Sequence, residues 1–389
     1  YQGKDDLKLQ NIYGNLIARI ANAAFPNIEP LGRIKKMSGY QKKIVFISAH
    51  FRPHTIFKLF SAWLIQLGSP QCEIHALNTA EYGDREIIQL KAAGVIVHVD
   101  CHALANKIER LVTLQPDVII FTDIGMDPVT QVIAGLRLAP QQSVAWGHPV
   151  TTGMPNIDSF LSSDLMEPID GNLHYSEKLV RLPGLSINYK MPNMRHPRTV
   201  SLDNPILFCS QSLFKILPSQ DVFFSRLLAE LPKASLRLVA HDNKAITQKF
   251  HSRLKLALEK DKINIDERVS ILPRVCVSRF LKLYSSSTVV LDTFKWSGGN
   301  TNLEALAMGV PIVTLPGKLM RSRHGHAMLQ LLELPELIAK NHDDWVEIVI
   351  KSVTDHDWRQ YLESRIQQNS HQLFNSNLWL RSLTKHIID

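Results

Sequence analysis

The chain has 389 residues, of which 45% are hydrophobic and 21% are charged. This length exceeds that of one typical domain, so we expect two domains, and the composition excludes a largely disordered chain, a collagen and a coiled-coil rod. The formal charge of +8 suits an anionic ligand such as a nucleotide, but without a basic and aromatic stripe we expect no nucleic-acid partner.

The four cysteines, Cys72, Cys101, Cys209 and Cys276, lie far apart and form no C-x-x-C pair. This spacing argues against a zinc site or a dense disulfide framework and favours reduced thiols in a cytoplasm. No apolar run reaches the ~20 residues that a membrane span needs, so we expect none. Tyr1 is not an initiator Met and no basic-then-apolar leader follows it, which is compatible with a fragment or a processed product.

Residues 1–40 are predicted to form a helical leader, because apolar residues recur near helical spacing until Pro26 and Pro30. The leader could be the remnant of a helical repeat region, although no internal repeat is visible. Strands and helices then alternate. The expected strands are Ile44–Ile47, Cys72–Leu77, Val95–Val99, Asp117–Phe121, Ser143–Trp146 and Ser159–Leu161, and the expected helices are Ile56–Leu67, Asp84–Ala93 and Ala103–Leu114.

A second alternating series begins near Pro205, after a proline-rich stretch, Leu182–Asn204, that we interpret as an interdomain linker. Its expected strands are Ile206–Cys209, Leu236–Ala240, Val269–Leu272, Val289–Asp292 and Pro311–Thr314. Its expected helices are Gln220–Leu231, Ile246–Glu259, Val277–Tyr284 and Asn302–Ala307, followed by closing helices over 343–388.

Strands that alternate with helices imply parallel βαβ units. We therefore predict an α/β chain with two Rossmann-like, doubly wound lobes and a cleft between them. The N-terminal lobe covers 41–195, and the C-terminal lobe covers 196–389 with its closing helices. Ligands of such sheets bind at the carboxyl ends of the strands, so the residues that follow strands are the candidates for function.

The segment Leu291–Glu304 reads as a strand end, a turn of small residues and a helix start. Gly298 and Gly299 permit close backbone approach and positive φ. The exposed N–H groups of a helix start attract a phosphate anion, and Glu304, one turn further on, can accept hydrogen bonds from a ribose diol. The alternative is a plain turn with a helix N-cap at Asn300 or Thr301.

Lys215 and two histidines also follow strands. Lys215 could neutralise a diphosphate; the alternative is a solvated loop lysine. His50 and His54 follow the first strand of the N-terminal lobe, where His54 is expected to open a helix. An imidazole suits general base catalysis near neutral pH, whereas the alternative is a histidine that is merely polar surface.

Three further segments are less specific. The loop 147–153, with Gly, Pro and Thr residues, is predicted to line the same cleft. The basic cluster is interpreted as a solvated helix start, although it could contact an anion; it comprises Arg321, Arg323, His324 and His326. The segment Asp355–Asp357 carries an Asp-x-Asp triplet of the kind that holds a divalent ion, but it lies in the late helical region, and we interpret it as a solvated helix start.

Five ordered segments of the chain resemble one family, the bacterial SPINDLY-type branch of the O-linked N-acetylglucosamine transferases, over about residues 42–385. These segments are Ser48–Thr55, 137–153, Ser162–Asp164, Tyr175–Pro183 and Asp292–Gly317. The Gly-His-Pro-x-Thr-Thr loop is also similar to that of bacterial cytoplasmic N-glucosyltransferases that modify adhesins. The resemblance implies a GT-B fold and an inverting, metal-independent transfer of sugar from a nucleotide sugar to a protein side chain, with no other cofactor.

The resemblance also implies roles for individual residues. Lys215 matches the lysine on the donor diphosphate, and His54 matches a histidine near the acceptor and the anomeric carbon. The remaining donor-site residues implied by the resemblance are Ser212, Arg274, Gly299, Asn300, Thr301 and Glu304, of which Glu304 matches the ribose acid. The residues implied for the cleft and acceptor loop are His50, His148, Thr151 and Thr152.

Departures from the family pattern leave the donor open. Animal enzymes carry histidine at Gly299, aspartate at Glu304 and, at Ser212, a glutamine that contacts the donor. We expect transfer of N-acetylglucosamine from its UDP conjugate to Ser or Thr of a bacterial protein such as flagellin or an adhesin. The alternatives are UDP-glucose-dependent N-glucosyl transfer, GDP-fucose-dependent O-fucosyl transfer, a nucleotide-sugar epimerase or hydrolase, and a module that binds without catalysis.

Overall fold

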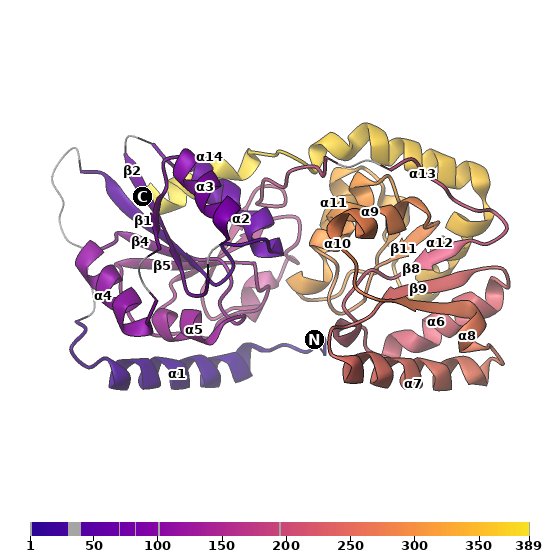
Figure 1. Cartoon of the computed structure of the whole chain (residues 1–389), viewed down its shortest axis with the longest axis horizontal. Coiled ribbons are helices and arrows are strands. Elements are labelled where there is room, and N and C mark those ends of the chain that lie inside the picture. Colours follow the sequence, from indigo (N-terminus) through magenta and orange to yellow (C-terminus); the bar gives the residue numbers. More distant parts are fainter. Residues whose placement is uncertain are drawn as a thin grey trace. The chain divides into compact units, whose positions relative to one another are not determined.

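The computed structural model describes residues 2–29, 40–69, 71–81, 83–99, 102–193 and 196–388. Its contacts divide the chain into two compact units. We call them the N-terminal unit, which is Asp5–Tyr189 with Ser376–Asp389, and the C-terminal unit, which is Lys190–Asn375 with Tyr1–Lys4. Each unit has its own parallel β-sheet with helices packed on it (Figure 1), so the predicted alternation of strands and helices is confirmed.

The sheet of the N-terminal unit has seven strands in the order β3-β2-β1-β4-β5-β6-β7, and every neighbouring pair is parallel. The strands are β1 (Lys42–Ser48), β2 (Cys72–Asn78), β3 (Ile96–His98), β4 (Val118–Phe121), β5 (Gln141–Ala145), β6 (Ser159–Ser163) and β7 (Lys178–Leu182). The apolar run of β1 is fully buried because this strand is central and has helices on both of its faces.

The helices of the N-terminal unit are α1 (Leu7–Ala24), α2 (Thr55–Gln66), α3 (Asp84–Ala92), α4 (Leu104–Leu114), α5 (Pro128–Ala134) and α14 (Leu378–Ile388), with a 3-10 turn η1 (Gly171–His174). Two elements were absent from the sequence prediction. Helix α5 has only seven residues, too few to show helical periodicity, and β7 is an edge strand whose residues alternate poorly between buried and exposed.

The sheet of the C-terminal unit has five parallel strands in the order β10-β9-β8-β11-β12. They are β8 (Ile206–Phe208), β9 (Ser235–Val239), β10 (Val269–Leu272), β11 (Val289–Leu291) and β12 (Ile312–Val313). All five lie within or beside the ranges expected from the sequence. Short apolar runs between turn residues therefore locate the buried strands of this unit correctly.

The helices of the C-terminal unit are α6 (Pro218–Glu230), α7 (Lys244–Lys260), α8 (Ile265–Arg268), α9 (Val277–Ser285), α10 (Asn300–Ala307), α11 (His324–Leu331), α12 (His342–Thr354) and α13 (His356–Asn369). Its 3-10 turns are η2 (Leu213–Lys215), η3 (Met320–Ser322), η4 (Pro335–Leu337) and η5 (Ser370–Gln372). The predicted helix start at Asp355 is confirmed, because its side chain caps α13 by accepting from the Trp358 N–H at 2.9 Å.

Helix α14 groups with the N-terminal unit, whereas the sequence analysis assigned 196–389 to the C-terminal lobe. The Lys42 ammonium, at the start of β1, donates to the Ile387 carbonyl at 3.2 Å. The apolar side of α14 is buried, including Trp379 and Leu383, and the Trp379 ring lies 5.8 Å from that of Trp63 on α2. The chain thus returns to its first sheet through contacts that no local pattern reveals.

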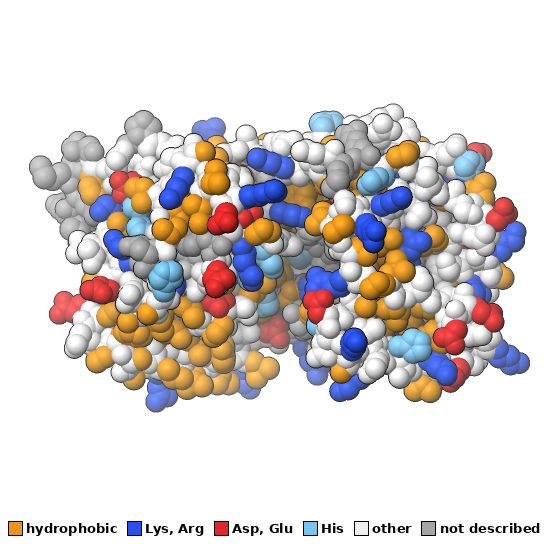
Figure 2. Space-filling view, viewed as in Figure 1, with side chains coloured by type: hydrophobic (Ala, Val, Ile, Leu, Met, Phe, Trp, Pro, Cys, Tyr) orange, Lys and Arg blue, Asp and Glu red, His pale blue; other side chains and the backbone are white. Residues whose placement is uncertain are grey.

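Helix α1 occupies only part of the predicted leader, and residues 30–39 lie outside the described part of the chain. It packs on α5 (Figure 1) and buries small residues, Gly14, Ala18 and Ala21. Its outer face is apolar, with Leu9 69% and Ile12 64% exposed, and Figure 2 shows hydrophobic side chains gathered over this helix. An amphipathic pattern near helical spacing therefore located the helix but did not reveal which side packs.

Candidate functional site

Each sheet has a topological switch point, where two neighbouring strands continue toward opposite edges of the sheet. The switch lies between β8 and β11 in the C-terminal unit and between β1 and β4 in the N-terminal unit. Ligands of doubly wound sheets bind beyond the carboxyl ends of these strands. The predicted residues Lys215 and His54, as well as the turn before α10, lie in the segments that leave three of these four strands.

Lys215 is the cation of the C-terminal switch point. It ends the 3-10 turn η2, shortly after β8, and its ammonium lies 5.1 Å from the ring centroid of Trp296 in the segment that follows β11. Burial lowers the pKa of Lys215 to about 8. The alternative of a solvated loop lysine is therefore wrong, and the ammonium is still protonated at pH 7.

The turn that follows β11 is organised by Asp292, a fully buried carboxylate. It accepts hydrogen bonds from the Gly298 N–H at 2.8 Å, the Ser297 hydroxyl at 2.5 Å and the Thr314 hydroxyl at 2.8 Å. Because Thr314 follows β12, these bonds tie the turn to the next strand of the sheet. Burial raises the pKa of Asp292, and its hydrogen bonds oppose that rise.

Glycine is required at only one of the two positions in this turn. A Cβ on Gly298 would lie 2.5 Å from the Thr301 hydroxyl, whereas a Cβ on Gly299 would meet only the His324 ring, at 4.0 Å. Neither glycine has a positive φ, so that part of the prediction is wrong, and the close approach holds at Gly298 alone. The space beside Gly299 is open at the point where α10 begins.

Helix α10 begins at Asn300, with Gly299 as its N-cap and no side chain in the capping position. The alternative of an N-cap at Asn300 or Thr301 is therefore wrong. No side chain caps this helix start, and the first N–H groups of a helix are an element that binds anions. Glu304 lies one turn further along and is buried. Because residues three and four apart share a helix face, Glu304 lies on the same side as Asn300 and Thr301.

The basic cluster opens helix α11, as the sequence predicted, but its side chains are not solvated as expected, and Arg323 and His326 are half-buried. Arg321 and His324 are buried, at 4% and 3% exposure, and both contact the turn before α10. The Arg321 carbonyl accepts from the Ser297 N–H at 2.8 Å, and its guanidinium carbon lies 5.8 Å from the Trp296 ring centroid. His324 Nδ1 lies 3.1 Å from the Ser297 carbonyl, and burial lowers its pKa to about 4, so the ring is neutral with its proton on Nδ1.

Two predicted donor residues lie on the surface. Ser212 is exposed and precedes η2, so it borders the segment that carries Lys215. Arg274 follows β10, the edge strand of the sheet, and pairs with Asp242 in the segment after β9. No contact between Arg274 and the turn is found among the described residues. A role of Arg274 in donor binding stays a prediction.

His50 and Asp123 meet at the switch point of the N-terminal unit. His50 follows β1, Asp123 follows β4, and the distance from His50 Nε2 to Asp123 Oδ2 is 3.6 Å. The His50 ring stacks on that of His54 with centroids 3.9 Å apart. His50 is 8% exposed and burial lowers its pKa, which contradicts the alternative of a polar surface histidine.

His54 opens α2 as predicted, and it caps the helix with its own ring. His54 Nδ1 accepts the Ile56 N–H at 3.2 Å. Burial and the neighbouring His50 lower the pKa of His54 to about 4, so the ring is neutral at pH 7. Because Nδ1 accepts with its lone pair, the proton of the neutral ring is on Nε2. A general base function of His54 stays a prediction and needs Nδ1 to release the helix.

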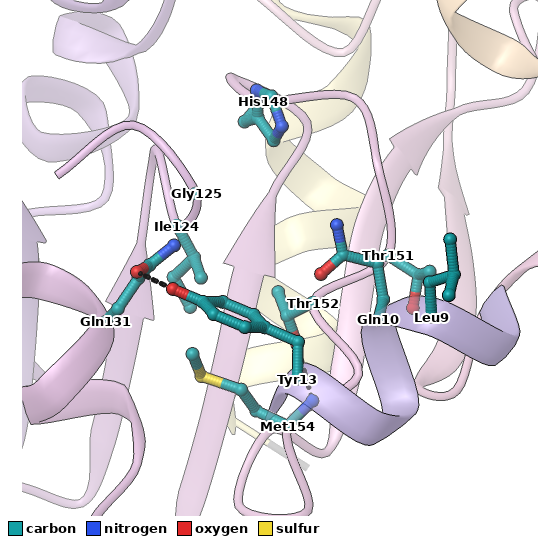
Figure 3. Close-up of a pocket in the computed structure, with 10 residues that line it drawn as sticks. All are labelled: Leu9, Gln10, Tyr13, Ile124, Gly125, Gln131, His148, Thr151, Thr152 and Met154. Carbon is teal, nitrogen blue, oxygen red and sulfur yellow. Dashed lines mark hydrogen bonds between the residues drawn. The ribbon is translucent and has the colours of Figure 1, made fainter. Parts of the chain in front are cut away.

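The predicted acceptor loop follows β5 and lies against the segment that follows β4. A Cβ on Gly125 would lie 2.7 Å from the His148 ring, which shows how closely the two segments pack. Thr151 donates its hydroxyl to Glu177 at 2.6 Å, and the Thr152 N–H and hydroxyl donate to the same carboxylate. The threonines thus hold the shape of the loop, and Figure 3 shows the loop beside a pocket.

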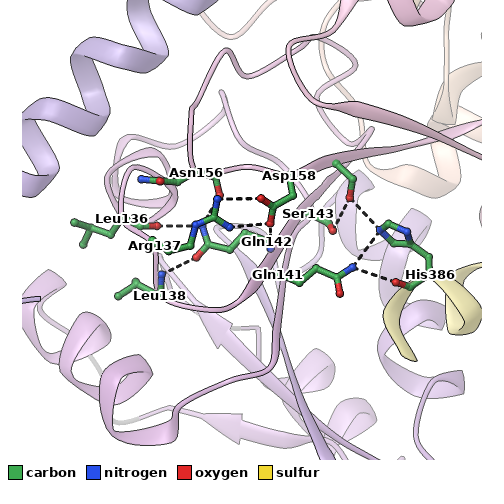
Figure 4. Close-up of polar contacts among 10 residues, drawn as sticks. Leu136, Arg137, Leu138, Gln141, Gln142, Ser143, Asn156, Asp158 and His386 are labelled. Carbon is green, nitrogen blue, oxygen red and sulfur yellow. Dashed lines mark hydrogen bonds and ion pairs between the residues drawn. The ribbon is translucent and has the colours of Figure 1, made fainter. Parts of the chain in front are cut away.

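A second polar network lies at the amino ends of β5 and β6 (Figure 4). Arg137 forms a bidentate pair with Asp158, at 2.8 and 2.9 Å, and the Gln142 side chain bonds the Leu136 and Asn156 carbonyls. At the other end, the His386 ring of α14 bonds the Ser159 hydroxyl at 3.0 Å. These residues position β5 and β6 and have no direct part in the site.

Four residues of the site were missed by the sequence analysis as functional candidates. They are Asp123, Glu177, Asp292 and Trp296. Asp123 follows one predicted buried strand and Asp292 ends another, both at switch points, so the rule that ligands bind at carboxyl strand ends could have found both. Glu177 and Trp296 are recognisable only from their contacts, which come from distant segments.

Several negative findings apply to the described part of the chain. There, no group of three or more His, Cys, Asp or Glu side chains is placed to hold a metal ion. Within the same residues, no helix is long and apolar enough to cross a bilayer. Cys72, Cys209 and Cys276 are free thiols, and Cys101 lies outside the described residues.

Comparisons with known proteins agree on one family. The profile of Glycosyl transferase family 41 matches residues 190–383. The probable UDP-N-acetylglucosamine–peptide N-acetylglucosaminyltransferase SPINDLY of Arabidopsis thaliana is 32% identical over 224 residues, which is 56% of this chain but 24% of that protein. The UDP-glucose:protein N-β-glucosyltransferase of Actinobacillus pleuropneumoniae is 24% identical over 255 residues, covering 64% of this chain and 40% of that protein. This chain therefore spans a quarter to two fifths of these relatives.

Among solved structures, a mutant of the Thermobaculum terrenum O-GlcNAc transferase has a TM-score of 0.81 at 23% identity, covering 96% of this chain and 72% of that chain. This similarity shows that the chain has the GT-B fold, as the sequence predicted. The family profile matches the unit that carries Lys215 and the turn before α10. We conclude that residues 190–383 of this chain belong to glycosyltransferase family 41.

Proposed function

We propose that this chain is a protein glycosyltransferase that transfers N-acetylglucosamine from UDP-N-acetylglucosamine to Ser or Thr hydroxyls, with inversion and without a metal ion. One observation carries the proposal: a half-buried lysine and a helix start that no side chain caps both lie at the switch point of the unit that matches family 41. The similarity to SPINDLY, a probable UDP-N-acetylglucosamine–peptide N-acetylglucosaminyltransferase, supports the choice of donor. We further propose a bacterial acceptor such as flagellin or an adhesin.

The chemistry explains why this pair of features matters. When the bond between the sugar and UDP breaks, negative charge develops on the leaving diphosphate. Lys215 and the first N–H groups of α10 are positive groups that are already in place, and one such preorganised donor contributes about 3–4 kcal/mol. Asp292 holds the turn that positions the helix start. These residues thus do the work that a divalent ion does in other transferases.

The acceptor hydroxyl attacks the anomeric carbon from the side opposite UDP, and its proton must leave. His54 Nε2 carries a proton in this structure, so it is set to donate to an oxygen of the substrate. It becomes a proton acceptor only when the ring turns and releases the Ile56 N–H. His50 stacks on this ring, and Asp123 in turn lies 3.6 Å from His50.

The proposal is tested by incubating the purified chain with a bacterial lysate and one nucleotide sugar at a time. UDP-N-acetylglucosamine, UDP-glucose and GDP-fucose are compared by mass spectrometry of the acceptor peptides, with and without EDTA. We expect transfer from UDP-N-acetylglucosamine that survives EDTA and collapses in Lys215→Ala. The matched control is Lys255→Ala, because that lysine is exposed on α7 of the same unit. Normal turnover of Lys215→Ala would show that the donor site lies elsewhere.

N-glucosyl transfer to asparagine is the second candidate, supported by the similarity to the Actinobacillus pleuropneumoniae enzyme over 64% of this chain. Mild alkali separates the two linkages, since it releases sugars from Ser and Thr by β-elimination but leaves an asparagine amide intact. Transfer from UDP-glucose to an alkali-stable site would favour this candidate. Rapid conversion of UDP-N-acetylglucosamine without any acceptor would favour an epimerase or a hydrolase instead.

A further inference from the structure

A pocket of about 360 Å³ opens at the carboxyl edge of the sheet of the N-terminal unit. Segments that follow β4 and β5 form one wall, with Gly125, His148 and Thr152, and helix α1 forms the opposite wall (Figure 3). Tyr13 projects from α1 between the two walls. The volume lies at the lower end of the range for ligand pockets.

The pocket exists because α1 approaches the acceptor loop at backbone distance. A Cβ on Gly14 would lie 2.3 Å from the Gly153 carbonyl oxygen, and a Cβ on Gly153 would lie 2.0 Å from the Gln10 carbonyl oxygen. Gly153 also has φ +67°, which disfavours any other residue. Gly14 and Gly153 thus allow α1 to pack directly against the backbone of the loop, which places Gln10 and Tyr13 at the pocket.

The lining is polar. Among the described residues it contains no Lys, Arg, Asp or Glu, its imidazole is that of His148, and its apolar part is Leu9, Ile124 and Met154. The Tyr13 hydroxyl donates to Gln131 Oε1 at 2.9 Å, which leaves the Gln131 amide N–H groups as donors beside the ring. Such a lining suits an uncharged ligand that has both hydrogen-bonding groups and apolar surface. A charged group would lose its hydration there without gaining a counter-ion.

The position of the pocket links it to the histidine pair. Ile124 lines the pocket and follows Asp123 in the chain. Asp123 Oδ2 lies 3.6 Å from His50 Nε2. The loop of Thr151 and Thr152, which the sequence places on the acceptor side, forms another part of the wall.

Building on the proposed function, we propose that this pocket is an acceptor subsite that binds uncharged residues flanking the modified side chain, and that α1 is part of it. Peptides with Ala, Ser, Thr, Asn or Gln at the flanking positions should fit. Peptides with Asp, Glu, Lys or Arg there should be rejected by at least about tenfold, which corresponds to about 1.4 kcal/mol.

Binding is measured directly, without turnover, from the NMR signal of the Met154 methyl group, assigned with Met154→Leu. The probes are two short peptides around one serine, flanked either by alanine and threonine or by aspartate. We expect the neutral peptide to shift the Met154 signal at lower concentration than the acidic peptide. Equal affinity for both peptides, or no shift of Met154 with the neutral peptide, would overturn the proposal.

A charge introduced into the pocket provides the second test. Gln131→Lys, and separately Gln10→Lys, should change the ratio of acidic to neutral peptide affinity by at least about tenfold in favour of the acidic peptide. Ile12→Lys is the matched control, because this residue lies on α1 but is 64% exposed and outside the pocket. Circular dichroism shows whether each variant is folded. The same change in Ile12→Lys, or none in either pocket variant, contradicts the subsite.

The two proposals fail in different ways. If no nucleotide sugar supports transfer while the Met154 signal, Gln131→Lys and Gln10→Lys behave as expected, the pocket binds peptides but the proposed transferase activity is wrong. If transfer occurs but no acceptor shows the predicted dependence on flanking charge, the proposed transferase activity is correct and the proposed subsite is wrong.

Discussion

Replacing Lys215 by Met should stabilise the chain while it weakens donor binding. Burial lowers the pKa of Lys215 from 10.5 to about 8, so the folded protein at pH 7 carries an ammonium that would be better hydrated in the unfolded chain. A shift of this size corresponds to about 3 kcal/mol. Methionine has a similar length without the charge, so it removes this penalty and loses a cation–π contact with Trp296 worth about 1 kcal/mol.

The sign of the pH dependence follows from the lowered pKa. The penalty is fully present below pH 8, where both the folded and the unfolded chains bind the proton. It disappears as the pH rises from about 8 to 10.5, because the folded chain loses its proton first. The free energy of unfolding of the wild type should therefore rise by about 3 kcal/mol across this window relative to Lys215→Met. At pH 7 the variant should be more stable by about 2 kcal/mol.

The assay is urea unfolding between pH 7 and 10, with and without UDP. UDP should raise the free energy of unfolding of the wild type with the logarithm of the UDP concentration. The Kd for UDP that is derived from this rise should be at least tenfold higher in Lys215→Met. Lys255→Met, at an exposed position of the same unit, should match the wild type in both respects. A variant that is less stable than the wild type and binds UDP equally well would refute the reasoning.

Further predictions concern three residues that shape the site. Asp292→Asn should lower the free energy of unfolding by about 1–3 kcal/mol and weaken UDP binding more than tenfold in calorimetry, because an amide keeps only one of the two oxygens that accept hydrogen bonds from the turn; unchanged affinity would contradict this. His54→Ala should lower the free energy of unfolding by about 1 kcal/mol, because the helix cap is missing, whereas His54→Asn should stay within ~0.5 kcal/mol of the wild type. Both variants should lose transfer activity. Because the pKa of His54 is about 4, the kcat/KM of the wild type should show no titration of this ring between pH 5 and 8. A rise of kcat/KM with an apparent pKa near 6.5 would disprove the view that the His54 ring is neutral throughout this range. Glu177→Gln should speed amide hydrogen exchange at residues 151–153 at least tenfold, since an amide cannot accept every bond that the carboxylate accepts; unchanged exchange would show that the loop is held otherwise.

Much of the fold could be predicted from the sequence, because the signals for parallel α/β structure are local. Short apolar runs between turn residues mark buried strands, and the strand order then brings their carboxyl ends together. Lys215 and the turn at Gly298 could be singled out because each follows such a strand. The edge strand β7 and the seven-residue helix α5 were missed, since edges and short helices leave little periodic pattern.

What only the tertiary structure decided is which local features meet. The basic cluster around Arg321 looked like a solvated helix start, but it is buried because its backbone and His324 bond to Ser297, more than twenty residues earlier. Helix α14 returns to the first sheet, and α1 docks on Gly153 through contacts between distant segments. Burial, pKa values and pockets depend on such long-range contacts, whereas helix and strand formation depends on neighbours in the chain. The sequence therefore determined the elements and the class of chemistry, and the packing determined the geometry of the site.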